Sequence, residues 1–180
     1  MNAFKIGILC FLVIVIISCN QAPEKEPCLY GDPTPILDET TAGISEYNFS
    51  SSDSSGTETA VISDTLLSEG QVRFTIKQVG CNEIKQTFTF ELPPNDYSTQ
   101  ADSFFVQRAA EALMVLSQKS QLARQSFIPM FAYELNTFAA GVSLNKALAV
   151  DSENAPGIFF NIDKIATTSD GIIILELFTK

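Results

Sequence analysis

The sequence predicts an α+β domain in which an antiparallel sheet of about five strands, built from two hairpins, is layered against two helices. Apolar and polar residues alternate with a period of two in 71–92 and again near the C-terminus, in 157–179, which predicts the hairpins. Between them, apolar residues recur at steps of three and four, which predicts helices. Strands, then helices, then strands is the order expected of an antiparallel sheet covered by helices.

The first hairpin is predicted by two alternating segments. Val72, Phe74 and Ile76 alternate with polar residues from Gln71 to Val79. After the turn residues 80–83 the alternation resumes, with Ile84, Phe88, Phe90 and Leu92 on one face. Pro93 and Pro94 cannot donate to a ladder and end the second strand. Ala60-Val61-Ile62 predicts a short preceding strand.

Two helices are predicted next. Thr99 and Asp102 have the spacing of a capping box, and an apolar face follows, made of Phe105, Ala109, Ala112, Leu113 and Leu116. Pro129 fits the first turn of a second helix that ends at Gly141. Phe131, Leu135 and Phe138 share one face of that helix.

The second hairpin joins Gly157–Ala166 to Gly171–Thr179 through a polar turn that contains Asp170. Its last strand, from Ile172 to Phe178, is apolar on both faces for most of its length. That pattern favours a central place in the sheet, with helices covering the strand.

The N-terminus carries an export signal. Lys5 precedes an apolar run from Ile6 to Ile17, which is short for a membrane span, and Ser18-Cys19 closes it. The sequence Ile16-Ile17-Ser18-Cys19 resembles the lipobox of bacterial lipoproteins. The resemblance implies that residues 1–18 are removed as a signal peptide and that Cys19 carries lipid. An ordinary cleaved signal peptide and an uncleaved membrane helix are the alternatives.

The same resemblance implies a place in the cell envelope. Asn20 stands where an aspartate would resemble an inner-membrane retention signal, so we expect an outer-membrane lipoprotein that faces the periplasm or the cell surface. Residues 19–57 are rich in Pro, Ser, Thr, Gly and Glu and are expected to form a lipidated tether. Residues 58–180 are then expected to form a single domain.

Two cysteines remain for a disulfide. Cys10 leaves with the signal and Cys19 is the lipid site, which leaves Cys28 and Cys81 in a compartment that permits oxidation. A bridge between them would close a loop of about 54 residues, and on the chain-entropy model it contributes roughly 4 kcal/mol. Two unpaired thiols are the alternative.

Charge and composition exclude several functions. Removing the signal takes away Lys5 and no acidic residue, which leaves 10 basic against 21 acidic side chains and a formal charge of −11. Such a field disfavours nucleic-acid binding. Histidine is absent, which removes the Ser-His and Cys-His nucleophile systems and histidine metal sites. We expect no catalytic site, metal or cofactor.

A few weak patterns remain. Ser143 and Lys146 have the S-x-x-K spacing of serine acyltransferases, and Asp64-Thr65-Leu66 resembles a short O-glycosylation acceptor. Asp151 with Glu153, and Asp163 with Asp170, are carboxylate pairs of the kind a glycoside hydrolase needs across a cleft. Solvated loop acids are the simpler interpretation of both pairs.

The sequence therefore favours a membrane-anchored, non-enzymatic domain that binds a protein or other envelope component. One alternative is a carrier of a small hydrophobic ligand, suggested by the 14 phenylalanines. The other is a periplasmic hydrolase that uses carboxylates alone.

Overall fold

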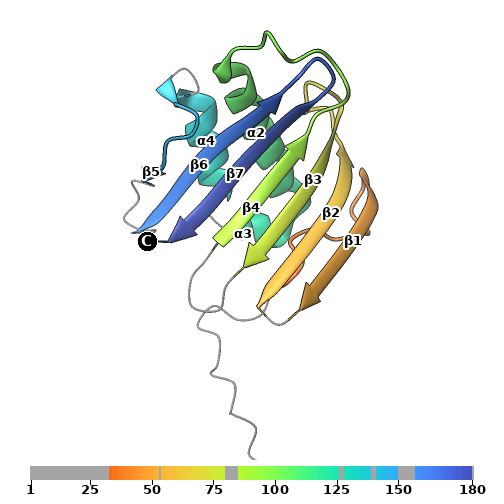
Figure 1. Ribbon diagram of the computed structural model, residues 1–180. Coiled ribbons are helices and arrows are strands. Elements are labelled where there is room, and N and C mark those ends of the chain that lie inside the picture. The colour runs from red at the N-terminus through yellow and green to blue at the C-terminus, as the bar shows by residue number, and fades with distance from the viewer. Residues whose placement is uncertain are drawn as a thin grey trace, which may run out of the picture.

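One antiparallel sheet with helices behind it makes up the part of the chain that the computed structural model describes, residues 33–52, 54–79, 85–125, 128–138, 141–149 and 157–179 (Figure 1). The strands are β1 (Ile44–Ser52), β2 (Ser55–Ser63), β3 (Gln71–Val79), β4 (Lys85–Glu91), β5 (Leu148–Ala149), β6 (Ile158–Ala166) and β7 (Gly171–Thr179). The helices are α2 (Asp102–Lys119), α3 (Gln121–Gln125) and α4 (Ile128–Phe138). The strand order is β1-β2-β3-β4-β7-β6-β5, and every neighbouring pair is antiparallel.

The predicted class, an antiparallel sheet layered against helices, is confirmed, and both predicted hairpins are present as β3–β4 and β6–β7. The predicted count of about five strands is wrong. Six strands have seven to nine residues each, and the two-residue β5 makes a seventh. The two predicted helices are α2 and α4, and the five-residue α3 lies between them in the chain.

The boundary predicted between a tether and a domain, at residues 57 and 58, is also wrong. In the serine-rich segment that favoured a tether, Ser50–Ser52 belong to β1 and Ser55 and Gly56 begin β2. A bulge between Ser45 and Asn48 explains why the alternation of apolar and polar residues does not predict β1. Because the extra residue breaks the alternation, Ile44, Tyr47 and Phe49 all become partly buried although their numbers differ in parity.

Helix α2 covers the sheet with the face that the sequence predicts, since Phe105, Ala109, Ala112, Leu113 and Leu116 are all fully buried. The predicted capping box is wrong. The N-cap is Ala101, it makes no side-chain cap, and the Asp102 carboxylate instead pairs with Lys164 Nζ at 2.8 Å. None of the described helices is long and apolar enough to cross a membrane.

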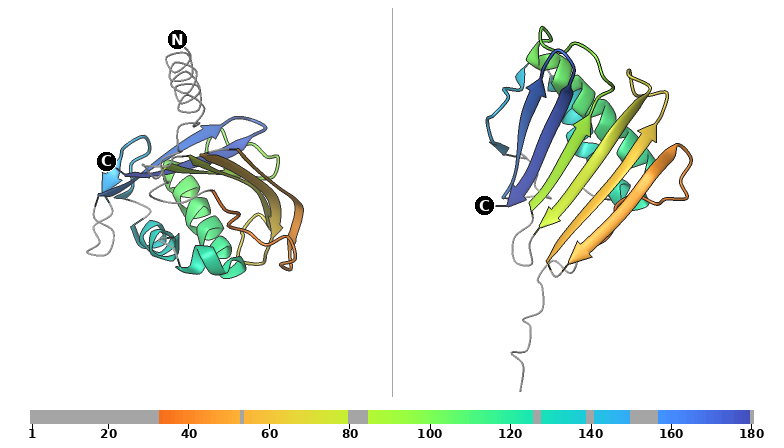
Figure 2. Two further views of the ribbon diagram at one scale, coloured as in Figure 1. Left: turned by 90° about the horizontal axis from the view of Figure 1, so that it is seen from below. Right: turned by 45° about the vertical axis from the view of Figure 1, so that its right-hand side comes forward.

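The core lies between the sheet and the helices, which cover one side only (Figure 2). Phenylalanines from different elements interlock there. Phe74 and Phe90 meet edge to face with ring centroids 5.0 Å apart, and Phe131 of α4 meets Phe160 of β6 in the same way at 5.2 Å. Much of the phenylalanine content is therefore used in packing the two layers together.

An N-terminal strap, residues 33–43, runs along the helix side of β2 before the chain enters β1. Thr34 O accepts a hydrogen bond from Gln78 Nε2 at 2.7 Å, and Leu37 is buried in the core. Ser120 Oγ, just after α2, donates to Ile36 O. Lys119 Nζ donates to Ala42 O at 2.8 Å, which fixes the end of the strap to the end of α2.

The strap is held from the sheet by a buried carboxylate. Glu58 is 1% exposed, and its two oxygens accept the backbone N–H groups of Ile36 and Leu37, each at 2.8 Å. The Tyr47 hydroxyl bonds to the same carboxylate. Burial raises the pKa of Glu58 above its usual value, although the hydrogen bonds from the strap and from Tyr47 act in the opposite direction. Burial and the neighbouring Glu58 charge raise the pKa of Tyr47 to about 12.

Candidate functional site

The sheet face turned away from the helices, here called the outer face, is the largest surface that the described elements leave uncovered (Figures 1 and 2). Residues of neighbouring strands form rows across it. One row runs from Asn48 through Thr59, Thr75, Thr89 and Ile174 to Asp163. This row therefore changes from the hydroxyl-bearing Thr59, Thr75 and Thr89 on β2–β4 to the apolar Ile174 on β7 and the acidic Asp163 on β6.

The apolar part of the outer face explains the pattern of β7. As predicted, β7 is central, between β4 and β6. The helices cover only one of its faces, however, so the expectation that they cover the strand as a whole is wrong. Ile172 and Ile174 point to the outer face, where Phe178 stacks on Phe159 with ring centroids 5.9 Å apart. Ile165 beside Ile172 is 47% exposed. This is an apolar surface of the kind that partners bind.

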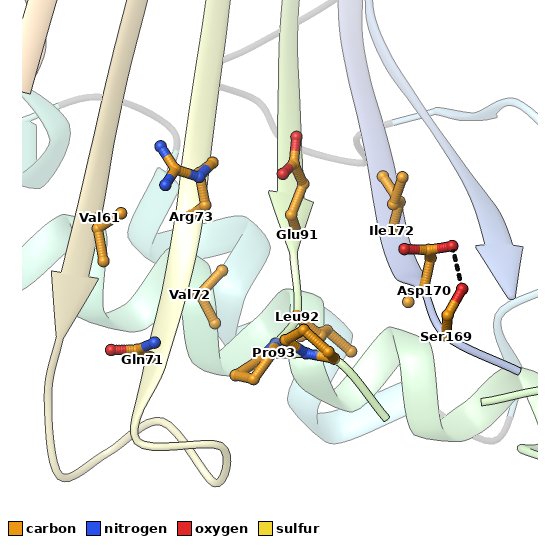
Figure 3. A pocket seen from close by; sticks show the side chains of 12 residues that line it. Val61, Gln71, Val72, Arg73, Glu91, Leu92, Pro93, Ser169, Asp170 and Ile172 are labelled. Carbon is orange, nitrogen blue, oxygen red and sulfur yellow. Dashed lines mark hydrogen bonds between the residues drawn. The ribbon is translucent and has the colours of Figure 1, made fainter. Parts of the chain in front are cut away.

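A hollow of about 300 Å³, here called the rim pocket, lies at one end of the outer face (Figure 3). Its floor is the outermost complete row, Val61, Arg73, Glu91 and Ile172. Its rim is formed by Gln71, Pro93, Pro94, Ser169 and Asp170. A volume of about 300 Å³ is at the lower end of the range for ligand pockets.

A buried tyrosine holds the walls of the rim pocket in place. Tyr97 is 2% exposed, and its hydroxyl donates to Pro93 O at 2.7 Å. Its backbone N–H donates to Thr167 O at 2.9 Å, in the β6–β7 turn. Between these two anchors the ring lies against Gly171, where an added Cβ would come within 2.7 Å of Tyr97 Cδ2. Pro93 and the β6–β7 turn are thus fixed relative to each other.

The β6–β7 turn also fixes the carboxylate of Asp170. Asp170 Oδ2 accepts hydrogen bonds from Ser169 Oγ at 2.6 Å and from Thr167 Oγ1 at 3.1 Å. The Asp170 backbone N–H donates to Thr167 Oγ1 at 2.8 Å. Asp170 therefore stands in one orientation at the rim, with Oδ1 making no hydrogen bond to the residues that the structure describes.

The charges in the rim pocket do not cancel. Arg73 is drawn toward β1 by Glu46, with Arg73 Nη2 2.6 Å from Glu46 Oε2. Glu91 is exposed, and its carboxylate makes no ion pair or hydrogen bond with the described part of the chain. Arg73 also lies directly opposite Glu91 in the strand register, so the pocket lining carries one positive and two negative charges. It can therefore attract a cation, and its aliphatic floor can accommodate an apolar stem.

Several other residues predicted as sites are not placed by the structure. Cys19, Cys28, Cys81, Asp151 and Glu153 lie outside the described residues.

Asp163 lies in the middle of β6, opposite Ile174, whereas Asp170 stands in the turn beyond the strand. Three residues separate Asp163 from the last paired residue of β6, about 10 Å along a strand, so these two acids do not face one reacting atom.

Ser143 and Lys146 flank the turn Leu144-Asn145, in which Asn145 has φ of 58°. The helical spacing that an S-x-x-K pair needs is therefore not present.

No group of three potential metal ligands occurs among the described residues. Comparison of the chain with protein-family models, with curated proteins and with solved structures finds no match.

Sequence analysis did not identify the roles of Glu91 and Glu58. Glu91 is an ordinary polar position in an alternating strand, and only the strand order brings it close to Asp170. Glu58 did leave a signal, because it shares the parity of the apolar residues Ala60 and Ile62. An acid in phase with a buried face is an indication of a buried carboxylate.

Proposed function

We propose that this chain is a membrane-anchored bacterial lipoprotein whose domain binds a protein partner in the cell envelope through the outer face of its sheet. The observation that carries the proposal is the uncovered outer face itself. It is as wide as six strands and about 30 Å long at 3.3 Å per residue, which gives roughly 700 Å². A standard protein interface buries about 800 Å² on each partner, so the outer face is large enough for one.

The composition of the outer face supports binding rather than simple solvation. It combines the exposed apolar residues Ile165 and Val79, 47% and 51% exposed, with one row of threonines on β2–β4, Thr59, Thr75 and Thr89. Asn161, also on this face, has an Oδ1 atom that is buried yet accepts no hydrogen bond from the described part of the chain.

The anchor rests on the lipobox and fits the position of the strap. In the proposal, Cys19 carries lipid and residues 19–32 form the tether, shorter than the sequence suggests because the strap begins at Pro33. Pro33 lies near Gly56, at the end of the sheet where β2 begins. The rim pocket lies at the opposite end, a nine-residue strand away, or about 30 Å. The outer face and its pocket would then extend away from the membrane.

The two alternatives have less support from the described residues. A carrier would use space between the layers, but interlocked phenylalanines fill the core there, and the rim pocket is lined by charged and polar groups as well as apolar ones. A hydrolase would need paired carboxylates facing one substrate, and Asp163 and Asp170 do not converge.

Site-specific photocrosslinking in intact cells tests the binding proposal. A benzoylphenylalanine at Thr89, in the centre of the outer face, is expected to yield an adduct of defined mass. The same group at Gln107, exposed on α2, is the matched control and is expected to yield none. The additional change Ile174→Glu, next to Thr89 across the strand pair, is expected to abolish the Thr89 adduct because it places a charge in the apolar surface.

The results that contradict the proposal are distinct. Equal adducts from Thr89 and Gln107 would indicate nonspecific proximity, and no adduct from Thr89 would indicate that the outer face has no protein partner.

The proposed lipid anchor at Cys19 has its own test. The wild-type protein is expected to incorporate labelled fatty acid and Cys19→Ser to incorporate none, and a wild-type protein that stays on membranes without label would contradict lipidation.

A further inference from the structure

We propose that the partner of the outer face is a second copy of this chain, which packs its own outer face against the first about a two-fold axis. The axis lies between the two sheets, runs across the strands and passes the middle of β4 at Phe88. The inference rests on the proposed binding function and names the partner. It follows from the strand register, which fixes where the charged and apolar side chains of the outer face stand.

Four rows of residues cross the outer face from β2 to β7, two on each side of Phe88. In β4 they contain Glu91, Thr89, Thr87 and Lys85 in turn, about 7 Å apart. A two-fold axis at Phe88 makes each strand face the same strand of the second copy with the order of the rows reversed. Glu91 of one copy then faces Lys85 of the other, and Thr89 faces Thr87. Each contact occurs twice, because a two-fold interface is reciprocal.

The charges of β4 suit this pairing. Lys85 and Glu91 stand at opposite ends of the strand, about 20 Å apart, so they attract each other closely only between two copies. Lys85 Nζ lies 3.3 Å from Glu176 Oε1 of its own chain, but the Lys85 side chain is 53% exposed. Since an ammonium group has three donors, it can also contact Glu91 of the second copy.

The other charged residues of the outer face do not oppose the pairing. Within the described strands, no two like charges face each other across the axis. Arg73 faces Val79, Lys77 faces Thr75, Glu176 faces Ile174 and Asp163 faces Asn161. Like charges that face each other would oppose association, so this arrangement favours a second copy as the occupant.

The apolar residues of β6 and β7 are matched in the same way. Ile165 and Ile172 lie side by side near one end of these strands, and the stacked rings of Phe159 and Phe178 lie near the other. The two-fold axis places the isoleucines of each copy against the phenylalanines of the other. Because this removes exposed apolar surface from water at two places, it stabilises the pair.

The size and geometry of the outer face also fit. Roughly 700 Å² from each copy gives about 1,400 Å² in total, within the roughly 1,200–2,000 Å² that stable interfaces bury. Two packed sheets cross at about 30°, which displaces Glu91 from Lys85 of the second copy by about 5 Å, or one strand spacing. The long stem of the lysine side chain spans that displacement.

The proposed anchor is compatible with the pair. Pro33 lies near Gly56 of β2, toward the β1 edge of the sheet. Because the axis runs from the β1 edge to the β6 side, both copies have Pro33 toward the same edge of the pair. Residues 19–32 reach up to about 45 Å, so both lipids can insert into one membrane. Anchoring in one membrane raises the effective concentration of the second copy.

Zero-length crosslinking of the full-length protein in isolated membranes tests the contact. A carbodiimide joins a carboxylate to an ammonium group that touches it. We expect mass spectrometry to find an amide between Lys85 and Glu91, which their separation of about 20 Å in β4 allows only between two chains. The amide between Lys85 and Glu176 of one chain is the internal control. Formation of the control amide without the Lys85–Glu91 amide would overturn the proposal.

Reversal of the two charges tests the symmetry. Two full-length chains with different affinity tags are produced in the same cells, and their co-purification in a neutral detergent is measured. Lys85→Glu in both copies, or Glu91→Lys in both, is expected to lower co-purification about tenfold, because like charges then meet at both contacts. A Lys85→Glu copy with a Glu91→Lys copy should restore it. Glu39→Lys, exposed on the strap, is the matched control and should change nothing.

The outcomes separate this proposal from the proposed binding function. Wild-type co-purification of either reversed variant, or no recovery in the combined pair, would overturn the two-fold pairing. A Thr89 photoadduct with a different protein, without the Lys85–Glu91 amide, would also overturn it and would leave the binding face in place. A Thr89 photoadduct that carries both affinity tags would support both proposals.

Discussion

At the scale of single residues, Glu58 is the most unusual group in the described structure. It is an acid with 1% exposure and no cation beside it, and it holds the strap through two backbone N–H groups. Burial raises its pKa, so the folded protein binds this proton more tightly than the unfolded chain does. The stabilising effect of protonation is thus fully present below the unfolded value of about 4.5 and is lost as the pH rises through the folded value.

We expect Glu58→Gln to remove this part of the pH dependence. For the wild type, the free energy of unfolding should fall as the pH rises from about 4.5 through the raised pKa, and for the variant that fall should be absent. The amide nitrogen of glutamine cannot accept a hydrogen bond, so either the Ile36 or the Leu37 N–H loses its partner. That loss should cost about 1–3 kcal/mol, less the relief from no longer burying a charge. Urea unfolding at several pH values measures both effects.

Glu39→Gln is the matched control for Glu58, since Glu39 is exposed on the same strap. It removes an acid from the strap without touching the Ile36 and Leu37 N–H groups, so it should change the free energy of unfolding by no more than about 0.5 kcal/mol. A Glu58→Gln protein with a wild-type slope would show that Glu58 does not titrate in the way its burial requires.

At the scale of secondary-structure elements, the link from β4 to α2 depends on the contact between Tyr97 and Gly171. The ring cannot move aside easily, because its hydroxyl is bonded to Pro93 O and the side chain is buried. Gly171→Ala would place a methyl group 2.7 Å from Tyr97 Cδ2. We expect this overpacking to lower the free energy of unfolding by about 1–3 kcal/mol. Thermal or urea denaturation monitored by circular dichroism measures the change.

Gly141→Ala is the control for Gly171→Ala, because an added Cβ at Gly141 meets no atom within 4 Å. Its effect should stay within about 0.5 kcal/mol, as for an ordinary surface substitution. If Gly171→Ala were as mild as Gly141→Ala, the ring of Tyr97 would have to move without cost, and it would not fix the walls of the rim pocket.

Elements with regular alternation could be predicted from the sequence, and irregular ones could not. In β3, Val72, Phe74 and Ile76 keep one parity and predict both the strand and its buried face. In β1 the bulge shifts the parity between Ile44 and Tyr47, and the four serines of the strand leave few apolar residues to show a pattern. The rim pocket was not predictable for a related reason. Glu91 and Asp170 are distant in the sequence and meet only because β4 pairs with β7.

At the scale of the whole molecule, the strap connects the proposed anchor to the two layers of the domain. From Pro33 to Gly43 it runs beside β2, bonded to Glu58 of the sheet and to Lys119 and Ser120 at the end of α2. A force applied through the proposed tether would therefore be transmitted to the sheet and to α2 together. A covalent crosslink near Pro33 would hold the strap against such a force.

The described residues next to Cys28 and Cys81 support such a crosslink, although both cysteines lie outside the described range. Thr34 O and Gln78 Nε2 are 2.7 Å apart. Cys28 precedes Thr34 by six residues, a reach of up to about 20 Å, and Cys81 follows Gln78 by three residues, a reach of about 10 Å. We infer that a disulfide between Cys28 and Cys81 is compatible with the contact between Thr34 and Gln78, because the chain lengths to the two cysteines permit it.

We expect the mature, lipidated protein purified without reductant to have no free thiol in denaturant, and two after reduction. Cys28→Ser and Cys81→Ser should each lower the free energy of unfolding by about 2–4 kcal/mol, because either change opens the same loop, and the double variant should be no less stable than the single ones. Two free thiols in the unreduced protein, or additive losses in the double variant, would show that the two cysteines act separately and that Glu58 and the end of α2 hold the strap without a covalent link.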